Sequence, residues 1–174
     1  MRLRPYQATD AETIVSWVRD ERAQRLWSAD RYSAYPVTAA DMNDKYLGNH
    51  GDCPGPGWFH PLTAVEDGQI VGHLILRYTD PEKTTVRFGF VIVDDARRGR
   101  GLGKEMLRLA EKYAFDTLGA DRLTLGVFDV NPAARRCYRA AGFRETPGAK
   151  KTEFAVLGET WHCIEMELLR DGDE

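Results

Sequence analysis

The chain has 174 residues, of which 43% are hydrophobic and 29% charged, and its formal net charge is −3 at pH 7. Such values are typical of a soluble globular protein and exclude a disordered or membrane-embedded chain. A chain of this length buries a core of its own, so we expect a single domain over residues 1–174. No apolar run approaches the ~18 residues of a membrane span, and the N-terminus lacks the apolar segment of a secretion signal. We therefore expect a cytoplasmic protein without a membrane partner.

The net charge and the cysteine spacing argue against further classes of function. A net negative charge argues against a nucleic-acid partner, because general nucleic-acid binding needs a basic excess. The three cysteines, Cys53, Cys137 and Cys163, show no CxxC spacing and no nearby pair of histidines. The sequence therefore predicts neither a disulfide framework nor a metal site.

Hydrophobic periodicity predicts the elements in chain order. Apolar residues recur at helical spacing in four segments, and we expect helices over residues 11–27, 39–50, 103–118 and 132–141. Thr9 or Asp10 would cap the first helix, and Thr38 followed by Asp41 opens the second. Short apolar runs between turn residues predict strands over residues 62–67, 70–78, 84–93, 122–128, 151–156 and 161–169.

The order of these elements predicts the fold class. The strand, helix and strand between residues 86 and 128 should form a right-handed parallel crossover. Hairpins before and after this crossover make the sheet mixed and mostly antiparallel. With helices on both faces, we expect an α/β (α+β) protein, a three-layer α/β/α sandwich with one central parallel βαβ crossover.

A glycine- and arginine-rich stretch, RRGRGLG at residues 97–103, joins a predicted strand to a predicted helix. Glycines let main-chain N–H groups converge at the first helical turn, where the helix dipole favours a diphosphate, and Arg98, Arg100 and Lys104 add positive charge. A nucleotide-triphosphate loop is excluded because Glu105 replaces the required hydroxyl residue, and a dinucleotide fingerprint because the glycines are out of phase. The alternative is a glycine-rich turn whose arginines only face solvent.

Two motifs carry a family resemblance. Arg98, Gly101 and Gly103 match the pattern Gln/Arg-x-x-Gly-x-Gly/Ala. Further along the chain, the pattern Asn-x-x-Ala-x-x-x-Tyr-x-x-x-Gly-Phe is matched by Asn131, Ala134, Tyr138, Gly142 and Phe143. In these motifs, in their order and over residues 86–143, the sequence resembles the GNAT superfamily of N-acetyltransferases. The resemblance implies direct transfer of the acetyl group of acetyl-CoA to a primary amine of a small molecule or peptide, through a tetrahedral intermediate and without a metal.

The resemblance also implies the site residues. The contacts to acetyl-CoA would come from Val91, Val93, Arg98, Gly99, Arg100, Gly101, Gly103, Lys104, Asn131 and Arg135. Tyr138 would be the general acid that protonates the departing CoA thiolate. Asn131 is also a good helix cap followed by proline, and Tyr138 could instead be a core residue. Helical spacing would place Asn131, Arg135 and Tyr138 on one face, and Cys137 is expected to point away from the site.

The proton acceptor and the acceptor amine stay open at this stage. Candidates for the base are Glu66, His73 and Glu165, whereas Arg87 occupies the position where some relatives carry a glutamate. Aromatic residues could form a cage for a cation together with Asp30, or serve the core: Trp27, Tyr32, Tyr35, Trp58, Phe59 and Trp161. A non-catalytic acyl-CoA-binding regulatory domain is the rival function, a longer acyl group is an alternative, and homodimer formation is left open.

Overall fold

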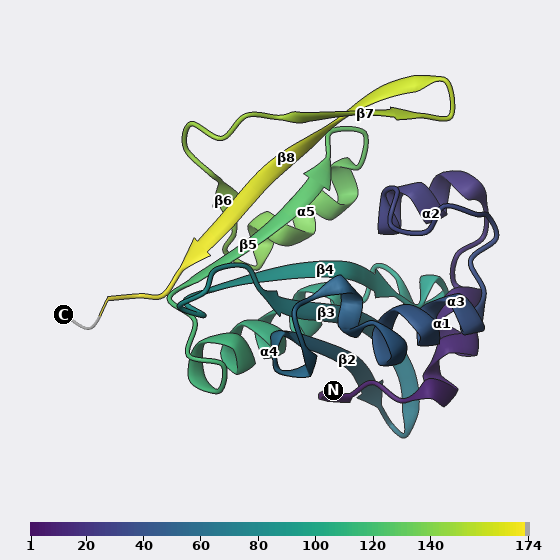
Figure 1. Ribbon diagram of the computed structural model, residues 1–174, viewed down its shortest axis with the longest axis horizontal. Helices are drawn as coiled ribbons and strands as arrows, with labels where there is room; N and C mark the ends of the chain where they lie inside the picture. Colours follow the sequence, from purple (N-terminus) through teal and green to yellow (C-terminus); the bar gives the residue numbers. More distant parts are fainter. Residues whose placement is uncertain (173–174) are drawn as a thin grey trace.

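The computed structural model describes residues 1–172, and its centre is an eight-stranded sheet with the order β1-β2-β3-β4-β5-β8-β6, in which β7 pairs with β8 (Figure 1). The strands are β1 (Arg2–Pro5), β2 (Phe59–Glu66), β3 (Gln69–Tyr78), β4 (Thr85–Val93), β5 (Arg122–Phe128), β6 (Arg144–Glu145), β7 (Thr152–Val156) and β8 (Glu159–Leu169). Of the described strand pairs, only β4 and β5 run parallel. The predicted mixed sheet with one parallel crossover is confirmed.

Helices cover both faces of the sheet and complete the three predicted layers. They are α1 (Ala11–Ser16), α2 (Glu21–Ser28), α3 (Ala39–Asn43), α4 (Leu102–Asp116) and α5 (Pro132–Ala140). Helices α4 and α5 lie behind the sheet in Figure 1, and α1 and α3 lie in front of it. Each face has its own hydrophobic cluster, one built on α4 and α5 and the other on α1 and α3.

The predicted first helix is wrong, because the chain makes two helices there. Helix α1 ends at Ser16, and α2 begins after Asp20, whose carboxylate accepts a hydrogen bond from the N–H of Ala23 at 2.7 Å. This second capping residue restarts the helix in a new direction. Asp10 does not cap α1 with its side chain. Its buried carboxylate accepts two hydrogen bonds from Arg4 instead, at 2.7 and 2.8 Å.

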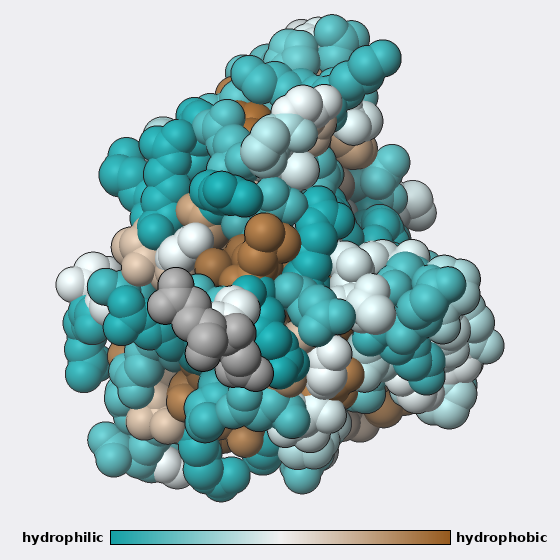
Figure 2. Space-filling view, turned by 90° about the vertical axis from the view of Figure 1, so that its left-hand side faces the viewer, coloured by the Kyte–Doolittle hydropathy of each residue, from teal (hydrophilic) through white to brown (hydrophobic). Residues whose placement is uncertain are grey.

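Two short strands, β1 and β6, are absent from the sequence prediction. Both are edge segments with little hydrophobic alternation, and their pairing partners lie far away in the chain. The end of the molecule shown in Figure 2 is mostly hydrophilic, with small and separated hydrophobic areas. Within residues 1–172, no helix combines the length and the apolar character needed to cross a membrane.

Candidate functional site

A cleft opens between the two parallel strands. Residues 85–87 of β4 pair with residues 122–124 of β5, and beyond these the strands diverge, with α2 at the wide end (Figure 1). The cleft has a volume of about 650 Å³ and is lined by residues 88–93 on one side and 125–128 on the other. On the open side, the main-chain groups of β4 beyond Arg87 have no strand partner among the described residues. A bound molecule can therefore pair with this strand edge.

A β-bulge shapes β4 where it borders the cleft. Phe90 has a φ of +48°, an unusual value for a bulky residue, and the register with β3 shifts between His73 and Ile75. The Phe90 ring is held in place by aromatic neighbours, with ring centroids 5.5 Å from Trp27 and 5.8 Å from Tyr32. Bulges bend the strand and occur often beside active sites. Val91 and Val93, which follow the bulge, both line the cleft.

The first turn of α4 presents unpaired donors to the same cleft. Gly99 and Gly101 have φ values of +79° and +75°, a left-handed conformation that favours glycine. Within residues 1–172, no hydrogen bond engages the main-chain N–H groups from residue 99 to residue 104. Arg98 and Lys104 line the cleft beside them, whereas Arg100 does not. Six free N–H groups, the helix dipole and two cations fit a diphosphate.

Gly103 brings α4 close to α5. A Cβ atom at Gly103 would lie 3.2 Å from Sγ of Cys137 and 3.8 Å from Cγ2 of Val93. Cys137 therefore lines the cleft, and the expectation that it points away is wrong. Burial raises the pKa of the Cys137 thiol, with a smaller opposing effect from Lys104, so the thiol stays protonated at neutral pH. A protonated thiol is a weak nucleophile.

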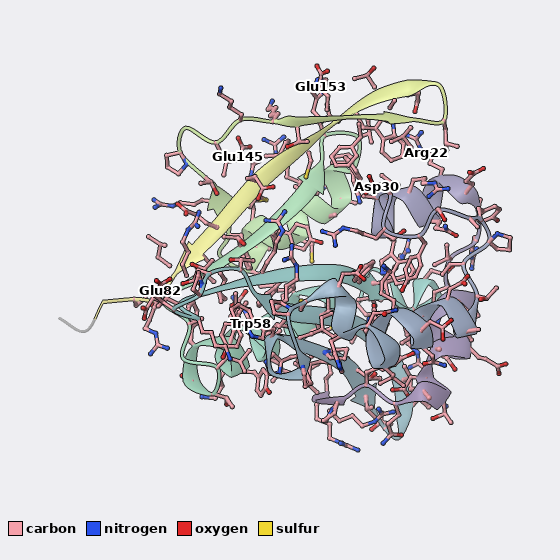
Figure 3. All side chains as sticks on the ribbon, viewed as in Figure 1. Arg22, Asp30, Trp58, Glu82, Glu145 and Glu153 are labelled. Carbon is pink, nitrogen blue, oxygen red and sulfur yellow. The ribbon has the colours of Figure 1, made fainter. Side chains whose placement is uncertain are left out.

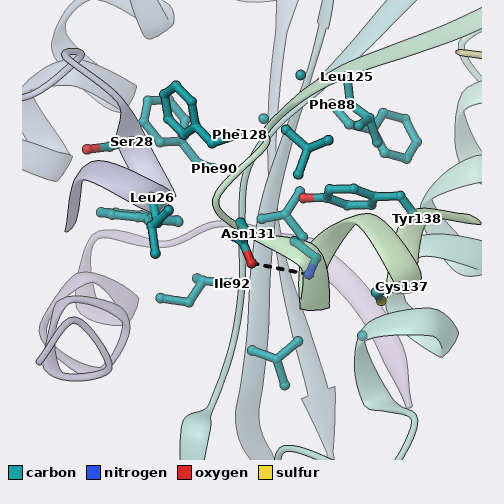
Figure 4. A pocket seen from close by; sticks show the side chains of 18 of the residues that line it. Leu26, Ser28, Phe88, Phe90, Ile92, Leu125, Phe128, Asn131, Cys137 and Tyr138 are labelled. Atoms are coloured by element: carbon teal, nitrogen blue, oxygen red, sulfur yellow. Dashed lines mark hydrogen bonds between the residues drawn. The ribbon is translucent and has the colours of Figure 1, made fainter. Parts of the chain in front are cut away.

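Helix α5 supplies two polar side chains to the cleft. The Asn131 side-chain oxygen accepts a hydrogen bond from the N–H of Ala134 at 3.2 Å, which caps the helix (Figure 4). The Tyr138 hydroxyl points into the space between β4 and β5, and it makes no hydrogen bond within the described part of the chain. Burial raises the pKa of Tyr138 far above its usual range. The phenol therefore keeps its proton at neutral pH and has no competing partner for it.

Arg135 lies outside the cleft, although it was expected to share one helix face with Asn131 and Tyr138. It forms an ion pair with Glu145 on β6, and Arg139 donates a hydrogen bond to the same carboxylate at 3.1 Å. The residues of α5 that face the cleft follow from Asn131 through Ala134 to Tyr138. An arginine one position after Ala134 is turned by ~100° around the helix and meets β6 instead.

Two of the three candidate bases lie away from the cleft. Glu66 stands at the end of β2 and lines a separate shallow pocket. His73 is fully buried and bonded to the Tyr46 hydroxyl at 2.8 Å, and burial lowers the pKa of its imidazole to about 4. Glu165 lies beside the cleft but accepts two hydrogen bonds from Arg87, at 2.7 and 3.0 Å. Neither Glu66 nor His73 can reach an amine bound in the cleft.

The expected aromatic cage does not form from the predicted set. Trp27 and Phe59 line the cleft, and Asp30 stands at its mouth, where α2 ends (Figure 3). The remaining four aromatic residues lie elsewhere. Tyr32 stacks behind Trp27, Trp161 is buried in the hairpin, Trp58 packs on Tyr78, and Tyr35 is exposed.

Several residues of the cleft were missed by the sequence analysis. Its apolar walls also contain Trp17, Phe90 and Phe128, and its charged residues include three arginines, Arg31, Arg77 and Arg87. A signal for two of these arginines was present, because each interrupts an otherwise apolar strand. A charged side chain inside such a strand needs a partner or a ligand. Among the described residues, no group of three or more histidines, cysteines and carboxylates could hold a metal ion.

A comparison with models of protein families shows to which family the chain belongs. A family model described as "Acetyltransferase (GNAT) family" matches residues 12–143. The chain belongs to the GNAT acetyltransferase family. The resemblance predicted from the two motifs is thereby confirmed.

Individual relatives agree with this assignment. The L-amino acid N-acetyltransferase AaaT of Escherichia coli (strain K12) is 31% identical over 91 residues, which cover 52% of this chain and 56% of AaaT. The match thus spans little more than half of that relative. Spermidine N-acetyltransferase from Vibrio cholerae, in complex with CoA and spermine, has a TM-score of 0.78 at 19% identity, covering 96% of this chain and 94% of that one. Aminoglycoside acetyltransferase AAC(6')-Ib, in complex with coenzyme A and kanamycin, has a TM-score of 0.71 at 18% identity, covering 97% of this chain and 94% of that one.

Proposed function

We propose that the protein is an N-acetyltransferase that uses acetyl-CoA to acetylate a primary amine of a small molecule or peptide. The observation that carries this proposal is the row of free N–H groups from residue 99 to residue 104, which opens into the same cleft as the Tyr138 hydroxyl. Acetyl-CoA supplies an activated thioester. The related enzymes named above act on L-amino acids or were crystallised with spermine or kanamycin, all of which carry primary amines.

The chain would hold the coenzyme mostly through its backbone. The N–H groups at the first turn of α4, with Arg98 and Lys104, bind the diphosphate. The unpaired edge of β4 at Val91 and Val93 runs beside the pantetheine arm and offers amide and carbonyl partners. Asn131 caps α5 with its side-chain oxygen, which leaves its amide group free to contact the arm.

Tyr138 is the proposed general acid. The amine nitrogen forms a bond to the thioester carbon, the carbon–sulfur bond breaks, and the departing thiolate takes the phenolic proton. A main-chain N–H of β4 near Val91 would stabilise the negative charge that develops on the carbonyl oxygen. The amine proton leaves through water, because Glu165 is engaged by Arg87 and the cleft is open to solvent. Water then returns a proton to the Tyr138 phenolate.

The proposal includes a cytoplasmic location and a single catalytic domain. The three cysteines are free, which fits a reducing compartment. No helix suited to a membrane span is found in the described residues. The rival function is a regulator that binds acyl-CoA without turnover. It would keep the free N–H groups of residues 99–104 but would need no general acid.

A thiol-release assay tests the proposal. The purified protein is incubated with acetyl-CoA and a panel of primary amines, while free CoA thiol is followed and products are weighed by mass spectrometry. We expect thiol release that depends on the amine, with a mass gain of one acetyl group on the acceptor. Tight binding of acetyl-CoA without thiol release across the panel would favour the regulator instead.

A further inference from the structure

Three arginines of the cleft lie near one another, because the charges of Arg31 and Arg87 both act on Arg77. Arg31 follows the end of α2, Arg77 lies on β3, and Arg87 lies on β4. Arg87 is paired with Glu165. The side chains of Arg31, which is exposed, and Arg77, which is half-buried, make no ion pair and no hydrogen bond with any of residues 1–172. Two cations therefore face this cavity without a protein partner.

Arg77 and Arg87 are direct cross-strand neighbours. Their Cα atoms are partners in the register of β3 and β4, so their side chains emerge on the same face of the sheet. Like charges at such a position destabilise a sheet. Burial, followed by the charges of Arg31 and Arg87, lowers the pKa of Arg77. A guanidinium keeps its charge in proteins, and Glu165 balances the charge of Arg87, so the charge of Arg77 is left for an anionic ligand to balance.

Both carboxylate oxygens of Glu165 accept hydrogen bonds from Arg87. A Cβ atom at Gly126 would lie 2.8 Å from Nη2 of Arg87, so the missing side chain of Gly126 is what lets the guanidinium cross β5. The charge of Glu165 also acts on Arg77, but both of its oxygens are already engaged by Arg87. Asp30 lines the same cavity, but it is exposed at the mouth (Figure 3).

We propose that the acceptor is a small amine that carries an oxyanion, either a carboxylate or a phosphate, and that Arg77 together with Arg31 binds this group. The inference rests on the proposed acetyltransferase function and names its substrate class. A guanidinium donates two parallel hydrogen bonds to one carboxylate or phosphate. The ligand anion would also balance the charge of Arg77 beside Arg87.

The rest of the cavity fits a compact acceptor rather than a polycation. Its walls are mostly apolar and aromatic, with Trp17, Phe59 and Phe90 around the arginines. A polyamine would place further positive charge beside Arg31, Arg77 and Arg87, and among the described residues that line the cleft the one carboxylate is Asp30, which is exposed, as is Arg31. An amine with an anion at one end gives each charge a favourable place.

Matched acceptors test the substrate class in the wild-type protein. L-amino acids are compared with their carboxamides and their decarboxylated amines, and phosphoethanolamine is compared with ethanolamine, by acetyl-CoA-dependent thiol release. We expect kcat/KM for the best oxyanion-bearing acceptor to exceed that of its uncharged counterpart at least about 10-fold, as for a lost charged hydrogen bond. The two series separate carboxylate from phosphate.

Arg77→Gln should then lower kcat/KM for the oxyanion-bearing acceptor about 10- to 100-fold, mainly through KM. The same variant should change kcat/KM for the carboxamide by no more than about threefold. Arg77→Lys should fall between the two, because lysine keeps the charge but loses the paired donors. Arg2→Gln, an exposed arginine on β1 outside the cleft, is the matched control and should leave every value unchanged.

The outcomes are separable. Equal or faster turnover of the carboxamides and decarboxylated amines overturns this inference while leaving the acetyltransferase function intact. An equal loss on all acceptors in Arg77→Gln, with unchanged CoA affinity by calorimetry, also overturns it. Absence of thiol release with every acceptor, while CoA binds, refutes the proposed function itself. Should Arg77→Gln fail to fold, the wild-type preference decides.

Discussion

Arg87 on β4 and Glu165 on β8 form an ion pair with two hydrogen bonds across the intervening strand β5, at 2.7 and 3.0 Å. The pair passes over Gly126, where a Cβ atom would lie 2.8 Å from Arg87 and 2.6 Å from Sγ of Cys163. The missing side chain of this glycine leaves the space in which the Arg87 guanidinium meets the carboxylate.

We expect Gly126→Ala to destabilise the protein by about 1–3 kcal/mol, because Cys163 and Arg87 must both move and the ion pair is disturbed. Urea denaturation followed by circular dichroism measures the difference. Gly55→Ala is the matched control, because no atom lies within 4 Å of a Cβ atom there. Equal stability of Gly126→Ala and wild type would mean that the pair adapts without cost.

We expect Gly101→Val to weaken CoA binding at least about 10-fold. A β-branched residue is strained at a φ of +75°, so the turn that directs the free N–H groups must rearrange. Isothermal titration calorimetry with CoA measures the loss. Gly148→Val provides the control, because Gly148 has a φ of +72° with open space around it and lies outside the cleft. Unchanged affinity in Gly101→Val would place the diphosphate elsewhere.

We expect Tyr138→Phe to lower kcat about 10- to 1,000-fold with little change in CoA affinity, because the departing thiolate loses its proton donor. Steady-state thiol release and calorimetry separate these two quantities. Tyr113→Phe on α4 removes a hydroxyl outside the cleft and should leave kcat unchanged. A collapse of CoA affinity with normal turnover of the remaining complex would make Tyr138 a packing residue.

Glu111 gives a prediction of pH dependence. It lies on α4 with one buried carboxylate oxygen that has no partner within residues 1–172, and burial raises its pKa to about 7, with a smaller opposing effect from Arg108. The unfolded carboxyl titrates near ~4.3, so between about pH 4 and pH 7 the folded state holds a proton that the unfolded state has lost. This contribution to the free energy of unfolding is complete below that range and disappears as the pH rises through about 7.

Glu111→Gln should therefore be more stable than wild type at pH 8, by about 1–2 kcal/mol, and the advantage should shrink at pH 5. Urea denaturation at both pH values provides the measurement. Glu82→Gln, an exposed change in the loop before β4, should show no such difference (Figure 3). A constant difference between Glu111→Gln and wild type at both pH values would contradict the shifted pKa.

The sequence was informative for most features whose signal is local. The βαβ crossover follows from hydrophobic periodicity and turn residues, and the family follows from two motifs at fixed spacing. The first helix was misjudged although its signal was local too, because Asp20 is a second capping residue inside an otherwise helical pattern. The edge strands β1 and β6 were missed because they have only four and two residues, too few to show a hydrophobic pattern.

Which side chains share the cleft was decided only by the tertiary structure. Arg135 pairs with Glu145 on β6, and His73 is buried in the core. Cys137 lines the cleft, where it packs against Gly103 of α4. Helical spacing places residues on a face, but packing of distant elements decides what that face meets.

By itself, then, the sequence determined the family, the order of most elements and the glycine turn before α4. These depend on residues that are close in the chain, where backbone preferences and spacing act directly. Only the tertiary structure decided that Arg77 stands opposite Arg87 and that Glu165 serves the second and not the first. Strand register and the empty space at Gly126 produce that arrangement, and both arise from contacts between segments far apart in the chain.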